Sequence, residues 1–198
     1  MRTEPHILAL ESVIHFNLFG MFKKNNFKKI RNQGSIVFKS QLLQDLTPFE
    51  RYELLQLCHR RKFKEGEFIY HQNDPGAGIY FIEEGSVRLV VSNSPENDQP
   101  EQFTVDISAP SELGIMSIGY EIPRMATAQC LTDSTLLGFF KPDFETLKKR
   151  NPETAVKFLE AVTNQTMKRF ELSMKQLKKS TDLKTAFSIM FREYRETE

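Results

Sequence analysis

The sequence predicts an α+β protein in which a jelly-roll or barrel of short β-strands lies between N-terminal helices and a long C-terminal helix. Three observations predict this fold. A capped helix begins near Thr47, short apolar runs separated by glycine and proline follow as far as Phe140, and a long stretch with helical spacing begins at Asn151. The predicted regions are a basic extension (residues 1–41), the roll with its flanking helices (42–150), the long helix (151–180) and a short terminal helix (181–198).

The N-terminal extension differs from the rest of the chain in charge. Residues 1–40 carry seven lysine and arginine residues against two glutamates, a net charge of +5, whereas the whole chain has a net charge of +1. Phenylalanines alternate with lysines in FNLFGMFKKNNFKKIRN. We expect a helical extension with three possible roles. It binds a membrane surface, it docks a partner, or it packs its phenylalanines on the core and leaves its lysines in water.

The stretch LTPFERYELLQLC predicts a helix with a well-defined start. Thr47 is suited to cap this helix, Pro48 suits its first turn, and Glu50 completes a capping box. Leu54 and Cys58 then fall on one face of the helix.

Runs with strand character follow this helix. The alternation is clearest in SVRLVVS and QFTVDI, and the polar stretch SNSPENDQPE between them predicts a hairpin loop. Short strands at even spacing, separated by turns, are typical of a jelly-roll or barrel. The predicted strands are Phe68–His71, Ile79–Glu83, Val87–Val91, QFTVDI, ATAQCL and STLLGFF.

Helical patterns return with KPDFETLKKR and with NPETAVKFLEAVTNQTMKRFELSMKQLKK, which begins with an asparagine cap and a proline. Along the second helix, a stripe of apolar residues either packs on the roll or contacts a second chain, and we expect a homodimer. A short helix from about Leu183 to Tyr194 is predicted to end the chain. The stripe consists of Met167, Phe170, Met174 and Leu177.

The composition excludes several classes of function. Hydrophobic residues make up 39% and charged residues 27% of the chain, as in ordinary globular proteins. Two distant cysteines and four scattered histidines offer no metal-binding or disulfide spacing, so we expect a reduced, cytoplasmic chain without a metal or resident cofactor. No apolar run approaches the ~20 residues of a membrane span. We expect no enzymatic activity and no catalytic residues, because no nucleotide-binding P-loop, zinc-protease motif or nucleophile–base spacing occurs.

The stretch ELGIMSIGYEIPRMATAQ places a single cation, Arg124, between a proline and a run of small residues. One interpretation is an anion clamp, in which Arg124 and the amides of a short helix hold a phosphate. The other is a surface loop with a solvated arginine.

The order of helix, strands, Gly-rich turns, PRMAT and long helix resembles the cyclic nucleotide-binding domain family of bacterial catabolite activators and kinase regulatory subunits. The resemblance covers about residues 42 to 178 and is carried by LLQDLTPFE, FKEGEFIYHQNDPGAGIYFIEEGSVRLV, ISAPSELG and PRMATAQCLTDSTL. It implies an eight-stranded β-roll, a bacterial regulatory or signalling role, and cyclic AMP or cyclic GMP as the possible ligand.

The family resemblance also implies roles for individual residues of the phosphate-binding segment. Gly114 is expected to let the backbone approach the ligand. Arg124 is expected to pair with the cyclic phosphate, with the Ala126 amide and the Thr127 hydroxyl beside it.

Two positions depart from the family pattern. The glutamate that contacts the ribose hydroxyl aligns with Ile115, which cannot accept a hydrogen bond, and Glu112 replaces it only if the local alignment shifts. The residues that contact the base align with Arg169 and Phe170, which either stack on a base or plug the pocket.

Two functions remain open from the sequence. The first is a regulatory module with a partly degenerate phosphate-binding segment that acts through dimerisation and protein contacts, and we favour it. The second is a cyclic AMP or cyclic GMP sensor that repositions its long helix. We expect no DNA binding, because only about 20 residues follow Lys178 and they contain no recognition helix. Contact with a membrane is expected only through the basic extension, if at all.

Overall fold

The computed structural model describes residues 35–92, 102–119 and 121–191. Most of the predicted basic extension, almost all of the predicted loop SNSPENDQPE and the end of the predicted terminal helix lie outside these residues. The predicted domain boundaries stay predictions.

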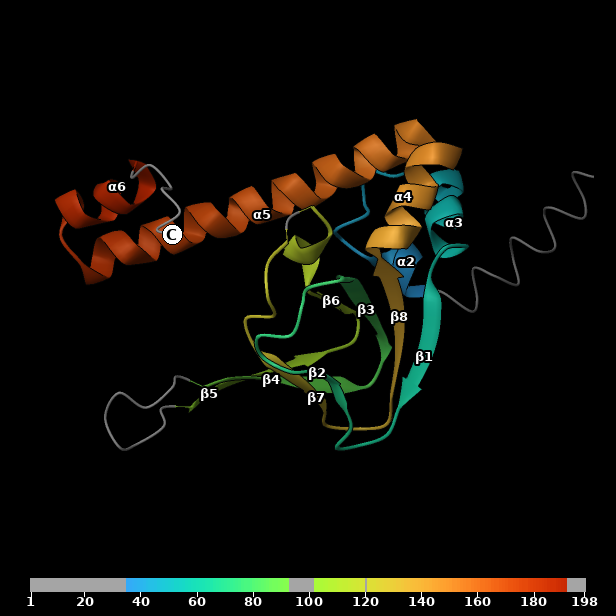
Figure 1. The fold of residues 1–198 in the computed structure, drawn as a ribbon, viewed down its shortest axis with the longest axis horizontal. Helices are drawn as coiled ribbons and strands as arrows, with labels where there is room; N and C mark the ends of the chain where they lie inside the picture. The colour runs from blue at the N-terminus through green and yellow to red at the C-terminus, as the bar shows by residue number, and fades with distance from the viewer. Residues whose placement is uncertain (1–34, 93–101, 120, 192–198) are drawn as a thin grey trace, which may run out of the picture.

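Two antiparallel four-stranded sheets form the centre of the molecule (Figure 1). Their facing sides make the predicted eight-stranded roll, so the predicted fold class is confirmed. The first sheet has the order β1-β8-β3-β6, with bounds His59–Phe63, Ser134–Phe140, Gly78–Glu84 and Ser111–Leu113. The second has the order β2-β7-β4-β5, with bounds Phe68–Tyr70, Thr127–Cys130, Ser86–Ser92 and Gln102–Ser108.

Two of the eight strands, β1 and β6, were not predicted from the sequence. Strand β1 reads HRRKF and lies at the edge of its sheet, paired only with β8. Four of its five residues are exposed, so its side chains show no apolar alternation. Strand β6 has only three residues, which is too short for a periodic pattern. Both strands form because a longer strand beside them supplies the hydrogen-bonding partner.

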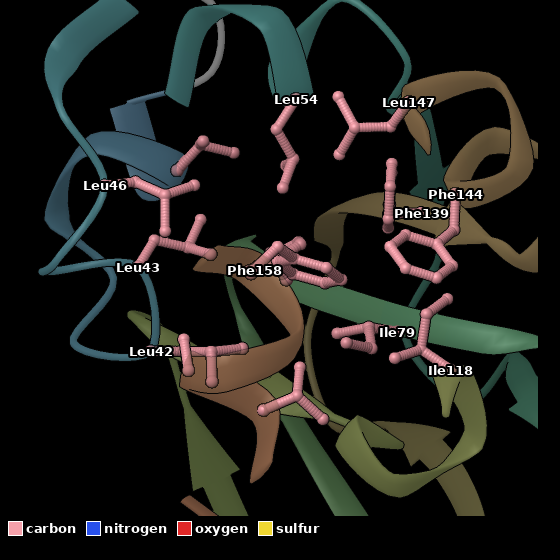
Figure 2. Close-up of a cluster of buried hydrophobic side chains, with 14 of the residues drawn as sticks. Leu42, Leu43, Leu46, Leu54, Ile79, Ile118, Phe139, Phe144, Leu147 and Phe158 are labelled. Carbon is pink, nitrogen blue, oxygen red and sulfur yellow. The ribbon is translucent and has the colours of Figure 1, made fainter. Parts of the chain in front are cut away.

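The hydrophobic core is divided by the first sheet. One cluster lies between the two sheets, inside the roll, and includes Tyr80 and Ile82 of β3. The other lies between the first sheet and the helices, and includes Ile79 and Phe81 of the same strand. Figure 2 shows this second cluster, in which side chains from strands and helices meet around Phe158. The alternation along β3 therefore assigns each side chain to one of two compartments.

Helices α2 (Ser35–Lys39), α3 (Pro48–Leu55) and α4 (Lys141–Arg150) lie near one end of the first sheet (Figure 1), where α2 contacts α3 and β3, and α4 contacts β8. The predicted capping box of α3 is confirmed. The Glu50 amide donates to Thr47 Oγ1 over 3.3 Å, and the Thr47 amide donates to Glu50 Oε2 over 2.7 Å. Glu50 Oε1 also accepts a hydrogen bond of 2.7 Å from Lys157 Nζ, which ties α3 to the long helix.

The long helix α5 (Pro152–Ser180) crosses the roll and then continues beyond it (Figure 1). Asn151 caps it, as predicted, by accepting a hydrogen bond of 3.2 Å from the Thr154 amide. The first half buries Ala155 and Phe158 against the domain. Helix α6 (Leu183–Phe191) packs beside the far end of α5. None of the helices in the described part of the chain is long and apolar enough to cross a membrane.

The side chains of the predicted stripe on α5 are only partly exposed to solvent in a single chain. Met174 is 9% exposed, so the chain itself covers this part of the stripe. Met167 and Phe170, by contrast, are 55% and 45% exposed, and Leu177 is half-buried. A partner helix would therefore contact mainly the middle of α5.

Candidate functional site

The candidate site begins where β6 ends. Gly114 has φ = 72°, a left-handed conformation that favours glycine, and it opens the short 3₁₀ helix η1 (Ile115–Ile118). The Ser117 amide closes this turn by donating to the Gly114 carbonyl over 3.0 Å. A Cβ atom on Gly114 would overlap Nη1 of Arg124. A side chain at this position would therefore be strained by the backbone and would displace the guanidinium.

Arg124 points into the roll and is only 5% exposed. Its amide donates to the Asp74 carbonyl and its carbonyl accepts from the Asn73 amide, both over 2.8 Å, so its backbone is fixed against the turn after β2. In the side chain, Nη2 donates to the Gly78 carbonyl over 3.0 Å and Nη1 donates to Ser117 Oγ over 3.3 Å. The alternative interpretation of a solvated surface arginine is therefore wrong.

Two tyrosine rings lie against the buried guanidinium. Arg124 Cζ is 4.4 Å from the ring centroid of Tyr70 and 5.8 Å from that of Tyr80. Both distances are within the range of cation–π attraction. Tyr70 and Tyr80 were not predicted as site residues, and neither was Ser117. They lie far from Arg124 in the sequence or carry no distinctive motif, so no local pattern marks them.

The charge of Arg124 has no counter-charge among the described residues. No carboxylate in this part of the chain lies within 4.0 Å of the guanidinium, and Nε has no hydrogen-bond partner there. Buried charges are usually paired, because an uncompensated charge in a protein interior is costly. A buried guanidinium with an unused N–H donor is therefore suited to receive an anion.

The other predicted phosphate contacts lie next to Arg124 in the chain. Thr127 begins β7, and its hydroxyl oxygen accepts a hydrogen bond of 2.9 Å from the Gln72 amide. The hydroxyl proton of Thr127 remains available to donate to a ligand. Ala126 is half-buried and directly precedes this strand.

The two predicted ribose contacts lie on the other side of the first sheet. Ile115 is 3% exposed and belongs to the core cluster between sheet and helices. In the pairing of β6 with β3, Glu112 lies opposite Phe81 of the same cluster, whereas Leu113 lies opposite Tyr80 inside the roll. Glu112 accepts a hydrogen bond from the Ser40 hydroxyl. The structure therefore brings neither Ile115 nor Glu112 to Arg124.

The two predicted base contacts are exposed on α5. Arg169 is exposed and Phe170 is 45% exposed, and neither is among the neighbours of the Arg124 side chain described above. Their role in binding a base stays a prediction. Among the described residues, no group of three or more histidine, cysteine or acidic side chains is arranged to hold a metal ion.

Comparison with known proteins gives similarity in sequence and in fold. Residues 60–151 match the sequence model of the cyclic nucleotide-binding domain. The cyclic AMP receptor protein of Thermus thermophilus is 32% identical over 117 residues, which make up 59% of this chain and 52% of that protein. The chain thus spans about half the length of this relative.

Two solved structures have a similar fold. The catabolite activator protein of Thermus thermophilus superimposes with a TM-score of 0.58 at 27% identity, covering 70% of this chain and 63% of that one. The N-terminal domain of a transcriptional regulator from Streptomyces coelicolor A3(2) gives a TM-score of 0.59 at 25% identity, covering 68% and 94%. The fold and the sequence match agree, and residues 60–151 of this chain are similar to the cyclic nucleotide-binding domain.

Proposed function

We propose that this chain is a non-catalytic regulatory protein whose domain keeps the phosphate contact of its family but lacks the ribose contact. It acts in the cytoplasm through dimerisation and protein–protein contacts. It binds cyclic AMP or cyclic GMP weakly and has no resident cofactor.

The observation that carries the proposal is the buried guanidinium of Arg124, which no described carboxylate neutralises. A cyclic phosphate is an anion of the size and charge that a guanidinium binds through paired hydrogen bonds. Gly114 lies directly beside Nη1, and the hydroxyl of Ser117 is within 3.3 Å of it. A phosphate at this position would meet the open Nε–H and hydroxyl donors together.

The placement of Ile115 supports a loss of affinity. The side chain lies in the hydrophobic core, so the position offers no acceptor to a ribose hydroxyl. Burying that hydroxyl without a partner costs about 1–3 kcal/mol, roughly a 5- to 150-fold loss of affinity. A submicromolar affinity would then fall to roughly 1–100 µM.

The free part of the α5 stripe supports the proposed homodimer. Met167 and Phe170 expose large apolar side chains on one side of a helix that extends beyond the roll (Figure 1). Apolar side chains at this spacing are suited to contact the same helix of a second copy.

A high-affinity sensor that repositions α5 is the second candidate. It is favoured by the contact between η1 and α5. A phosphate bound at η1 would therefore act on an element that touches the long helix. Such a ligand shifts α5 only to the extent that it binds one arrangement more tightly than the other.

Calorimetry with cyclic AMP and cyclic GMP tests both candidates. We expect weak binding by the wild-type protein and none by Arg124→Ala. Arg88→Ala serves as a control that keeps the affinity, because it removes a half-buried guanidinium that is paired with Asp106 rather than with any neighbour of Arg124. Submicromolar binding that is lost in Arg124→Ala would establish the sensor instead. The absence of any heat of binding up to millimolar nucleotide would refute the phosphate contact.

A further inference from the structure

The aromatic neighbours of Arg124 come from both sheets of the roll. Tyr70 belongs to β2 and Tyr80 belongs to β3, and their ring centroids lie 6.2 Å apart. We propose that Tyr70 and Tyr80, here called the tyrosine clamp, are positioning residues that hold the charged guanidinium inside the roll for an incoming anion. This inference rests on the proposed function, because it explains how the phosphate contact is kept ready.

An irregularity in β2 turns Tyr70 into the roll. Phe68 pairs with Gln129 of β7, whereas Tyr70, two residues later, pairs with the adjacent Ala128. In a regular strand, residues 68 and 70 would point to the same face. Here Phe68 is 50% exposed, whereas Tyr70 packs in the cluster inside the roll with the fully buried Ala128. Bulges of this kind redirect side chains and are frequent next to functional sites.

Tyr80 reaches the guanidinium from the opposite sheet. It lies on β3 opposite Leu113 of β6 and Gly138 of β8, and it is 8% exposed. Leu113 directly precedes Gly114, so Tyr80 is held close to the start of η1. One tyrosine ring from each sheet thus lies near the same guanidinium.

The clamp stabilises the cation without neutralising it. The face of an aromatic ring attracts a cation through its quadrupole but carries no formal charge. A carboxylate in the same place would compete with a phosphate, whereas a tyrosine leaves the full positive charge of Arg124 available. Burial raises the pKa of Tyr70, although Arg124 acts in the opposite direction, so the ring stays uncharged at neutral pH.

Three substitutions on strand β2 distinguish the effect of the Tyr70 ring on affinity from the effect of apolar packing around it. Tyr70→Leu removes the π face but keeps an apolar side chain, and Tyr70→Phe keeps the ring. Phe68→Leu is the matched control, because it makes the same kind of change on the outer face of β2. We expect Tyr70→Leu to bind cyclic AMP about 10-fold more weakly, within the roughly 2- to 30-fold range of a cation–π contact. Tyr70→Phe restores most of the affinity, and Phe68→Leu stays within about 2-fold of the wild type.

Nuclear magnetic resonance of arginine side chains tests the clamp without any ligand. The Nε–H signal of Arg124, assigned by its loss in Arg124→Ala, should be shifted by the ring current of Tyr70. We expect this shift in the wild type, in Tyr70→Phe and in Phe68→Leu, and its loss in Tyr70→Leu. Thermal unfolding of each variant verifies that the protein is folded.

The outcomes distinguish the inference from the proposed function. Equal affinity and an unchanged Nε–H signal in Tyr70→Leu would refute the clamp while leaving the phosphate contact intact. A wild-type protein that binds no nucleotide would refute the phosphate contact and the purpose assigned to the clamp. A loss of affinity in Phe68→Leu as large as in Tyr70→Leu would assign the effect to general stability.

Discussion

Replacement of Gly114 by alanine tests the geometry on which the site depends. Gly114 has φ = 72°, and a Cβ atom there would overlap Nη1 of Arg124. Gly119, five residues later, provides the control. It has φ = −97°, and no atom lies within 4 Å of the position that its Cβ would occupy. The two substitutions add the same methyl group at the two ends of η1.

The expected cost of Gly114→Ala combines two terms. A left-handed conformation costs a residue with a Cβ about 1–2 kcal/mol, of which the lower entropy of the unfolded alanine chain offsets about 0.4–1 kcal/mol. Displacement of the guanidinium weakens its hydrogen bonds to Ser117 and Gly78, each worth about 1.5–3 kcal/mol for a charged donor. Because the flexible arginine keeps some of these contacts, we expect a loss of about 3 kcal/mol.

Urea denaturation measures the free energy of unfolding of both variants, and thermal unfolding measures their Tm. A loss of about 3 kcal/mol corresponds to a decrease in Tm of roughly 6–12 °C for a chain of this size. Gly119→Ala is expected to leave the stability unchanged or to raise it by up to about 1 kcal/mol. Equal free energies of unfolding for the two variants would refute the contact between Gly114 and Arg124.

Three further predictions follow from the core, the α3 cap and the α5 stripe. Ile115→Glu is expected to lower the free energy of unfolding by about 3 kcal/mol or more, because it buries an unpaired carboxylate. It is not expected to raise nucleotide affinity in calorimetry, and a stable variant with tighter binding would contradict the placement of Ile115 in the core. Burial raises the pKa of Glu50, but hydrogen bonds from Lys157 and Thr47 outweigh it and hold the pKa below 4.5. Its contribution to stability is therefore present above pH 4.5 and lost as the pH falls through the lowered value. Glu50→Gln should flatten this acid dependence in urea titrations, whereas the exposed Glu145→Gln should not, and parallel curves for wild type and Glu50→Gln would refute the assignment. Phe170→Asp is expected to convert a dimer to a monomer in sedimentation equilibrium, whereas Leu172→Asp, exposed outside the stripe, keeps the dimer; a Phe170→Asp dimer would exclude this surface.

The sequence was informative where the physical cause is local. The capping box of α3 depends on residues three positions apart, and both of its hydrogen bonds are present. The alternation in SVRLVVS reflects a face that packs inside the roll, where Val87 is buried. QFTVDI alternates in the same way, although its Phe103 and Val105 are exposed. Arg124 was identified from its short local pattern and from the family resemblance, and its burial agrees with an anion clamp.

The remaining features depend on partners that are distant in the chain. Strand β1 has exposed, basic side chains, and its conformation comes from pairing with β8, about 70 residues later. The inward direction of Tyr70 depends on a shift in register against β7, which no pattern within FIY shows. Whether Ile115 faces the helices or the roll depends on how η1 follows Gly114. Periodicity and spacing within the sequence do not predict such contacts between distant segments.

A crystal structure grown with millimolar cyclic AMP would test the central claim most directly. We predict density for the cyclic phosphate with its oxygens about 2.7–2.9 Å from the nitrogens of the Arg124 guanidinium, inside the roll. Nucleotide density elsewhere, or an empty roll with Arg124 still bonded only to Ser117 and Gly78, would contradict it.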